Sequence, residues 1–112
     1  MRPTISIDWD GTLTMGDGYH SSFSDELRPG AVEFLKTLHD DFEIVIHTAR
    51  SASHWGRIRA ILEQEGVHVV LVSNIKVPAV AYLDDRALHF DGSYMKALAE
   101  IRSAYTKYAA GG

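Results

Sequence analysis

The chain is 112 residues long, is 46% hydrophobic, carries a formal net charge of -4 and contains no cysteine. That length fits one domain with its own core, and the missing cysteines exclude a disulfide framework, a thiolate zinc site and a cysteine nucleophile. The excess of acidic residues argues against a protein built to coat nucleic acid. No apolar run nears the roughly 20 residues of a membrane helix, and no signal peptide is apparent. We therefore expect a cytoplasmic protein without a membrane partner.

Strand-like and helix-like segments alternate from the start of the chain. The first strand is expected at Thr4 to Trp9, where Ile5, Ile7 and Trp9 share one face. A loop rich in Gly, Ser and Asp follows from Gly11 to Arg28. Pro29-Gly30 then opens a helix, whose apolar stripe consists of Ala31, Phe34, Leu35 and Leu38.

The alternation continues through the second half. Glu43 to Thr48 contains an Ile-Val-Ile run that is apolar on both faces, as in a buried parallel strand. Ser51 or Ser53 can cap a second helix with Ile58, Ile61 and Leu62 as its stripe. Further strands are expected at Val67 to Val72 and Val80 to Leu83, with a short fifth at Leu88 to Phe90. The final helix presents one apolar face, formed by Tyr94, Ala97, Leu98, Ile101 and Tyr105.

This pattern is typical of an α/β domain. We expect residues 1–112 to form a single Rossmann-like, three-layer domain. Its sheet should be mainly parallel, with about five strands and helices on both faces.

The expected strand ends carry a concentration of polar side chains. In open parallel sheets, ligands bind beyond the carboxyl ends of the strands. Four carboxylates, a hydroxyl and two cations fall at this edge: Asp8 and Asp10 after the first strand, Thr48 and Arg50 after the second, Lys76 before the fourth, and Asp84 and Asp85 after it. Gly11 follows Asp10 directly.

Crowded carboxylates repel one another unless a cation intervenes, and hard oxygen ligands suit Mg²⁺. Arg50 and Lys76 beside such an ion suit an anionic substrate, with phosphate the obvious candidate. Taken singly, each residue has an ordinary interpretation: an Asp-Gly turn, a solvated cation, or a polar turn at Asp84-Asp85-Arg86. The joint interpretation is stronger because all of these residues fall at one edge.

Four segments in this order resemble the motifs of the haloacid dehalogenase-like superfamily of phosphohydrolases. Asp8-Trp9-Asp10-Gly11-Thr12-Leu13 is similar to the first motif, and Ile44-Val45-Ile46-His47-Thr48 is similar to the second. Lys76 and the segment Val80 to Asp85 are similar to the third and fourth. The resemblance extends from about Thr4 to Phe90 and is strongest to a group of small, capless bacterial and phage phosphatases.

The resemblance implies a Mg²⁺-dependent phosphomonoester hydrolase. Asp8 is expected to be the nucleophile that forms an aspartyl-phosphate, with Asp10 as the general acid and then the general base. The expected Mg²⁺ ligands are the carboxylates of Asp8 and Asp84, the backbone carbonyl of Asp10, and Asp85 in support.

The resemblance also implies how the phosphoryl group is held. Thr48 is expected to donate a hydrogen bond to its oxygens, and Lys76 to offset charge on it and on the nucleophile. Gly11 and Arg50 are further candidates for substrate binding.

Cap insertions in this superfamily usually follow the first strand's loop or the third strand, and both gaps are short here. We therefore expect an open site and a phosphorylated substrate that is either a small ester or a polymer end. A neighbouring copy in a homo-oligomer is another way to cover such a site. Two alternatives remain: a non-catalytic module that binds phosphate or metal, and a phosphatase of nucleic-acid ends such as 3′-phosphates. The net charge of -4 gives nucleic acid no support as a partner.

Overall fold

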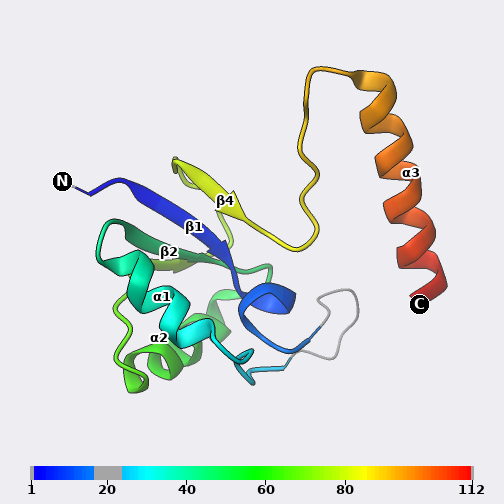
Figure 1. Ribbon diagram of the computed structural model, residues 1–112. Coiled ribbons are helices and arrows are strands. Elements are labelled where there is room, and N and C mark those ends of the chain that lie inside the picture. The colour runs from blue at the N-terminus through cyan, green and yellow to red at the C-terminus, as the bar shows by residue number, and fades with distance from the viewer. Residues whose placement is uncertain (1, 17–23, 112) are drawn as a thin grey trace.

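The computed structural model describes residues 2–16 and 24–111. Figure 1 shows a sheet with two helices against one side and a third helix standing apart. The strands are β1 (Thr4–Asp8), β2 (Glu43–His47), β3 (Leu71–Ser73) and β4 (Ala81–Leu83). The helices are α1 (Ala31–His39), α2 (Trp55–Gln64) and α3 (Tyr94–Gly111), together with a 3₁₀ turn at Ala52–His54 and a wide helical turn at Trp9–Leu13. The expected α/β class with a parallel sheet is confirmed.

The order of the strands brings two strand ends together. Across the sheet the order is β3-β2-β1-β4, and each neighbouring pair is parallel. The chain steps outward from β1 to β2 and β3, then returns to the other side of β1 with β4. Open α/β sheets bind ligands where the strand order reverses in this way. The crevice beyond the carboxyl ends of β1 and β4 is therefore the expected ligand site.

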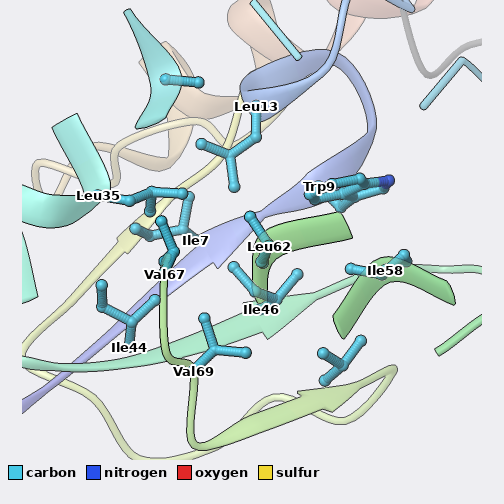
Figure 2. Close-up of a cluster of buried hydrophobic side chains, with 12 residues drawn as sticks. Ile7, Trp9, Leu13, Leu35, Ile44, Ile46, Ile58, Leu62, Val67 and Val69 are labelled. Carbon is cyan, nitrogen blue, oxygen red and sulfur yellow. The ribbon is translucent and has the colours of Figure 1, made fainter. Parts of the chain in front are cut away.

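One face of the sheet carries the hydrophobic core. The register pairs Ile7 of β1 with Ile46 of β2, so both side chains point to the same face. Figure 2 shows these side chains packed against Leu35 of α1 and against Ile58 and Leu62 of α2. All five side chains are fully buried. Trp9 is also fully buried and continues the face of Ile7, as the pattern of the first strand predicts.

Two expected strands differ from the sequence prediction. The third strand begins at Leu71, because the N–H of Val67 bonds back to the Leu62 carbonyl at 2.9 Å and so stays with the end of α2. The fifth strand, at Leu88 to Phe90, is not formed, and this prediction was wrong. The described residues provide no strand beside this segment, and a backbone without a ladder partner satisfies its polar groups with water instead.

The second face of the sheet has no helix packed on it among the described residues. α3, expected to complete the third layer, lies beyond the sheet edge at the end of an extended segment (Figure 1). Its apolar side chains face solvent: Tyr94, Ile101 and Tyr105 are 81%, 56% and 69% exposed. No helix in the described parts of the chain combines the length with the hydropathy that a membrane crossing requires.

The loop after the wide turn is closed at its base. Thr14 and Leu27 form an isolated antiparallel bridge, and the N–H of Met15 donates to the Glu26 carbonyl at 2.8 Å. Within the loop expected from Gly11 to Arg28, residues 17–23 lie outside the described residues. The connection from β3 to β4 is only seven residues long, 74–80, as the expectation of a site without a cap requires.

Candidate active site

Three carboxylates meet in the crevice between β1 and β4. Asp8 is the last residue of β1, and Asp84 and Asp85 directly follow β4. Each offers an oxygen atom, and these oxygens lie within 4.8 Å of one another. Asp8 is half-buried, whereas the other two are exposed. We call these residues the acidic cluster; all three were predicted as metal ligands.

The acidic cluster favours a cation. Burial raises the pKa of Asp8 to about 7, and the negative charges of Asp84 and Asp85 act in the same direction. A cation among the three carboxylates offsets the repulsion between them. Three hard oxygen donors and their combined charge fit Mg²⁺.

Thr12 connects the two sides of this crevice. Its hydroxyl donates to Oδ2 of Asp8 at 3.3 Å and accepts the N–H of Asp85 at 3.1 Å. The N–H of Arg86 donates to Oδ1 of Asp84 at 2.8 Å. Hydrogen bonds from both loops thus orient the acidic cluster. Thr12 was not among the residues predicted to have a function.

The wide turn Trp9–Leu13 begins directly after Asp8 and contains the next carboxylate, Asp10. Gly11 has a φ of +82°, a conformation that disfavours any residue with a Cβ. Its N–H donates to Oγ1 of Thr14 at 3.3 Å, and its carbonyl accepts from Nη2 of Arg28 at 3.0 Å. Gly11 was predicted to bind substrate, and here its polar groups contact the turn and the loop.

Asp10 has different surroundings from Asp8. Thr48 donates from Oγ1 to Oδ2 of Asp10 at 3.0 Å. Arg50 donates to Oδ1 from Nε at 3.1 Å and from Nη2 at 2.8 Å. Nη1 of Arg50 donates to Oδ1 of Asp25 at 2.8 Å. We call Asp10, Asp25, Thr48 and Arg50 the Arg50 network.

Arg50 is only 5% exposed, so its charge must be neutralised within the protein. Burial acts to lower the pKa of Arg50, but hydrogen bonds and attraction from Asp10 and Asp25 outweigh it and raise the pKa above its usual value. The guanidinium therefore stays charged. Thr48 and Arg50, both predicted to contact substrate, are bonded to Asp10 in this structure.

Sequence reasoning missed Asp25. Burial acts to raise its pKa, but hydrogen bonds from Arg57 and Arg50 lower the pKa below the ordinary value. Nε of Arg57 donates to Oδ2 of Asp25 at 2.7 Å, and the indole N–H of Trp9 lies 3.5 Å from Oδ1. An aspartate between Ser24 and Glu26 in a predicted loop is equally typical of a turn, so no local signal marked this residue.

Lys76 reaches the same region from the loop before β4. It lines a groove of about 760 Å³ together with Asp8 and Asp84. Its Nζ lies 4.7 Å from the centre of the Tyr82 ring, within the range of a cation–π contact. The predicted lysine therefore lines the same groove as Asp8 and Asp84 and lies over Tyr82, on the second face of the sheet.

A smaller pocket of about 190 Å³ adjoins this groove. It is lined by Asp8 and Asp10 from the first motif and by Asp84 and Asp85 after β4. Arg86 also lines it, a cation that the sequence analysis assigned only to a polar turn. All four predicted carboxylates therefore border one small space.

Comparison with known proteins agrees with this geometry. A model of the NLI interacting factor-like phosphatase family matches residues 3–107, a span that includes the acidic cluster and the Arg50 network. No curated protein matches the chain at significant similarity. Among solved structures, a conserved protein from Bacteroides thetaiotaomicron is 20% identical over 92% of each chain, with a TM-score of 0.64. That likeness supports the fold alone.

Proposed function

The chain belongs to the NLI interacting factor-like phosphatase family, and from that premise we propose that it is a Mg²⁺-dependent phosphomonoesterase in which Asp8 is the nucleophile. The observation that carries the proposal is the acidic cluster, set where the strand order reverses, with Asp10 two residues further on. The superfamily's mechanism requires one carboxylate to attack phosphorus and a second to move protons.

In the first step, an oxygen of Asp8 attacks phosphorus while the bond from phosphorus to the ester oxygen breaks. The product on the protein is an aspartyl-phosphate. The Thr12 hydroxyl holds Oδ2 of Asp8 at 3.3 Å, which orients the carboxylate for in-line attack. The leaving oxygen takes a proton from Asp10. In the second step, water gives a proton to Asp10 and attacks the same phosphorus, which frees Asp8 and inorganic phosphate.

The contacts of Asp10 constrain these proton transfers. Both of its oxygens accept hydrogen bonds, Oδ1 from Arg50 and Oδ2 from Thr48, so the carboxylate is directed into the Arg50 network. The first step requires the protonated form. We therefore propose that Asp10 turns away from Arg50 toward the small pocket when the substrate binds.

The carboxylates of Asp8, Asp84 and Asp85 would hold Mg²⁺, with the backbone carbonyl of Asp10 as a further ligand. When bound, the ion supplies positive charge that offsets the repulsion between the nucleophile and the phosphoryl oxygens. Lys76, on the groove wall, would bind those oxygens from the second face of the sheet. Thr48 would become available to donate to them when Asp10 turns.

We also propose that residues 1–112 act as one capless domain in the cytoplasm. The groove beside Asp8 is open rather than enclosed. Such a site admits a large phosphorylated substrate or a small ester, and it excludes water poorly without further cover.

The test is hydrolysis of an aryl phosphate with Mg²⁺ and with EDTA. We expect Asp8→Asn to lower kcat/KM by at least about 10³-fold with the fold intact by circular dichroism. Asp41→Asn, an exposed carboxylate after α1, is the matched control and should retain full activity.

Full activity in Asp8→Asn contradicts the proposed nucleophile. Activity that is insensitive to EDTA contradicts the metal. Absence of hydrolysis across sugar phosphates, nucleotides and 3′-phosphorylated oligonucleotides favours the non-catalytic alternative.

A further inference from the structure

Within residues 2–16 and 24–111, no helix packs on the second face of the sheet. All-parallel sheets are found with both faces buried, because their strands are apolar on both sides. α1 and α2 cover the face of Ile7 and Ile46. On the opposite face, Ser6 of β1 pairs with Val45 of β2 and with Tyr82 of β4, and Val45 also pairs with Leu71 of β3. Ser6 and Val45, in the central strands, are buried, whereas Tyr82 and Leu71, in the edge strands, are 42% and 39% exposed.

α3 is the complementary case, because its apolar face packs against no sheet in the part of the chain that the structure describes. Its 18 residues place Tyr94, Leu98, Ile101 and Tyr105 on one stripe, at the spacing of a helix that packs by one face. All four are exposed. An apolar stripe of this length on an isolated helix is normally an interface.

The accessible surface and the radius of gyration both indicate that the chain exposes a surface suited to an interface. Its accessible surface is 7299 Å², whereas a compact monomer of 12.4 kDa exposes about 6,100 Å². Its radius of gyration is 15.0 Å, against about 13 Å for a compact domain of this length. The excess surface, about 1,200 Å² in each chain, is enough in two chains for a stable interface of roughly 1,600 Å².

The segment between β4 and α3 directs the helix away from its own sheet. At one end, the bond from Asp85 N–H to Thr12 holds the chain at the crevice. At the other end, Ser93 caps α3 through a 3.2 Å bond from the Lys96 N–H, and Asp91 pairs with Lys96 at 3.0 Å. Between these points the chain is extended in Figure 1.

We propose that the protein forms a two-fold dimer by exchanging α3. The apolar stripe of each α3 packs on the second face of its partner's sheet, against the exposed side chains of Leu71 and Tyr82. This exchange changes no contact within either chain, and two-fold symmetry makes the assembly a closed dimer. The charges also favour it: α3 carries a net charge of +2, and the remaining chain -6, the helix charges being Lys96, Glu100, Arg102 and Lys107.

The exchange has a consequence for the active site. The groove that holds Asp8 and Lys76 opens on the second face of the sheet and includes Tyr82. A partner helix on that face becomes one wall of the groove. The second copy thereby supplies the cover that each chain lacks.

The first experiment measures molar mass by light scattering at about 100 μM. We expect twice 12.4 kDa for the unmodified chain. Leu98→Glu should raise the dimer dissociation constant at least about 30-fold, because the substitution enters the interface twice. Ser103→Glu adds the same charge on the opposite side of α3 and is the matched control, which should stay dimeric. A monomeric mass for the unmodified chain at this concentration overturns the proposal.

The second experiment identifies the contact. Because the chain has no cysteine, chains with only Leu98→Cys and only Leu71→Cys can be mixed and treated with a short bismaleimide. A product joining the two different chains supports exchange. Products that join only two Leu98→Cys chains indicate a helix-to-helix dimer and overturn it. A Leu98→Cys, Leu71→Cys double variant that cross-links only within one chain shows the helix folded back on its own sheet, and also overturns it.

Discussion

Asp8 and Asp10 are two residues apart and have opposite surroundings. Asp8 faces two further carboxylates and has its pKa raised to about 7, whereas Asp10 accepts hydrogen bonds from Thr48 and Arg50. Without metal, Asp8 is therefore partly protonated near neutral pH. The comparison teaches that the acidic cluster concentrates like charges, whereas the carboxylates of the Arg50 network are paired with a cation of the chain itself.

The largest effect should come from removing the proton-transfer group. Asp10→Asn should lower kcat by about 10²- to 10⁴-fold, since proton transfer by a positioned side chain contributes that much. The loss should be greater for an alkyl phosphate than for an aryl phosphate, whose leaving group needs less protonation. Steady-state kinetics with both substrates measures this, and equal losses would contradict the role of Asp10 as an acid.

Breaking the Arg50 network should affect stability. Arg50→Ala removes the buried cation that Asp10 and Asp25 share and should lower the free energy of unfolding by about 3–5 kcal/mol. Arg57→Ala is the matched control: Arg57 also pairs with Asp25, but its side chain is 70% exposed. Its loss should cost less than about 1 kcal/mol. Urea unfolding measures both variants, and similar losses would show that burial of Arg50 is unimportant.

The acidic cluster should control Mg²⁺ affinity. Asp84→Asn should weaken binding at least about 10-fold in calorimetric titrations, whereas Asp91→Asn, at the far end of the same connecting segment, should not. Because the ligands bind metal in the deprotonated form and the pKa of Asp8 is raised to about 7, affinity should rise from pH 5 to 7 and level off above pH 8. Affinity that is constant with pH would contradict this.

The smallest expected effect is a gain in stability. The pKa of Asp8 is about 7 in the folded chain and 3.8 when unperturbed, so the folded state binds the proton more tightly. Stability of the metal-free protein should therefore fall as pH rises between these values. Asp8→Asn removes this loss and should stabilise the protein at pH 8 by about 1–2 kcal/mol, a value reduced for solvent screening.

Urea unfolding in EDTA tests this last prediction. At pH 5 only part of this loss has developed, so the stability difference between the variant and the unmodified protein should be smaller than at pH 8. A destabilised Asp8→Asn at pH 8 would show that the carboxylate is not repelled by its neighbours.

The strand ends were predictable because their signals are local. An apolar run followed by Asp8, or by Asp84 and Asp85, predicts both the strand and the residues at its end. Parallel topology then brings these ends together without further information. The fold class and the position of the acidic cluster follow from those two facts.

The partners of Arg50 were not predictable because they come from three separate segments. Asp10, Asp25 and Thr48 meet Arg50 only once β1, β2 and the loop before α1 are assembled. The prediction of where α3 packs was wrong for a related reason. Helical periodicity predicts an apolar stripe but does not identify the surface that the stripe covers.

The two tryptophans give the Arg50 network a spectroscopic signal. Trp9 is fully buried with its indole N–H 3.5 Å from Asp25, and the indole of Trp55 donates to the Arg50 carbonyl at 3.0 Å. The sequence contains no other tryptophan. Tryptophan fluorescence therefore comes entirely from side chains that contact this network. A shift in emission on adding a phosphate analogue would follow the departure of Asp10 from Arg50 in real time, without any label.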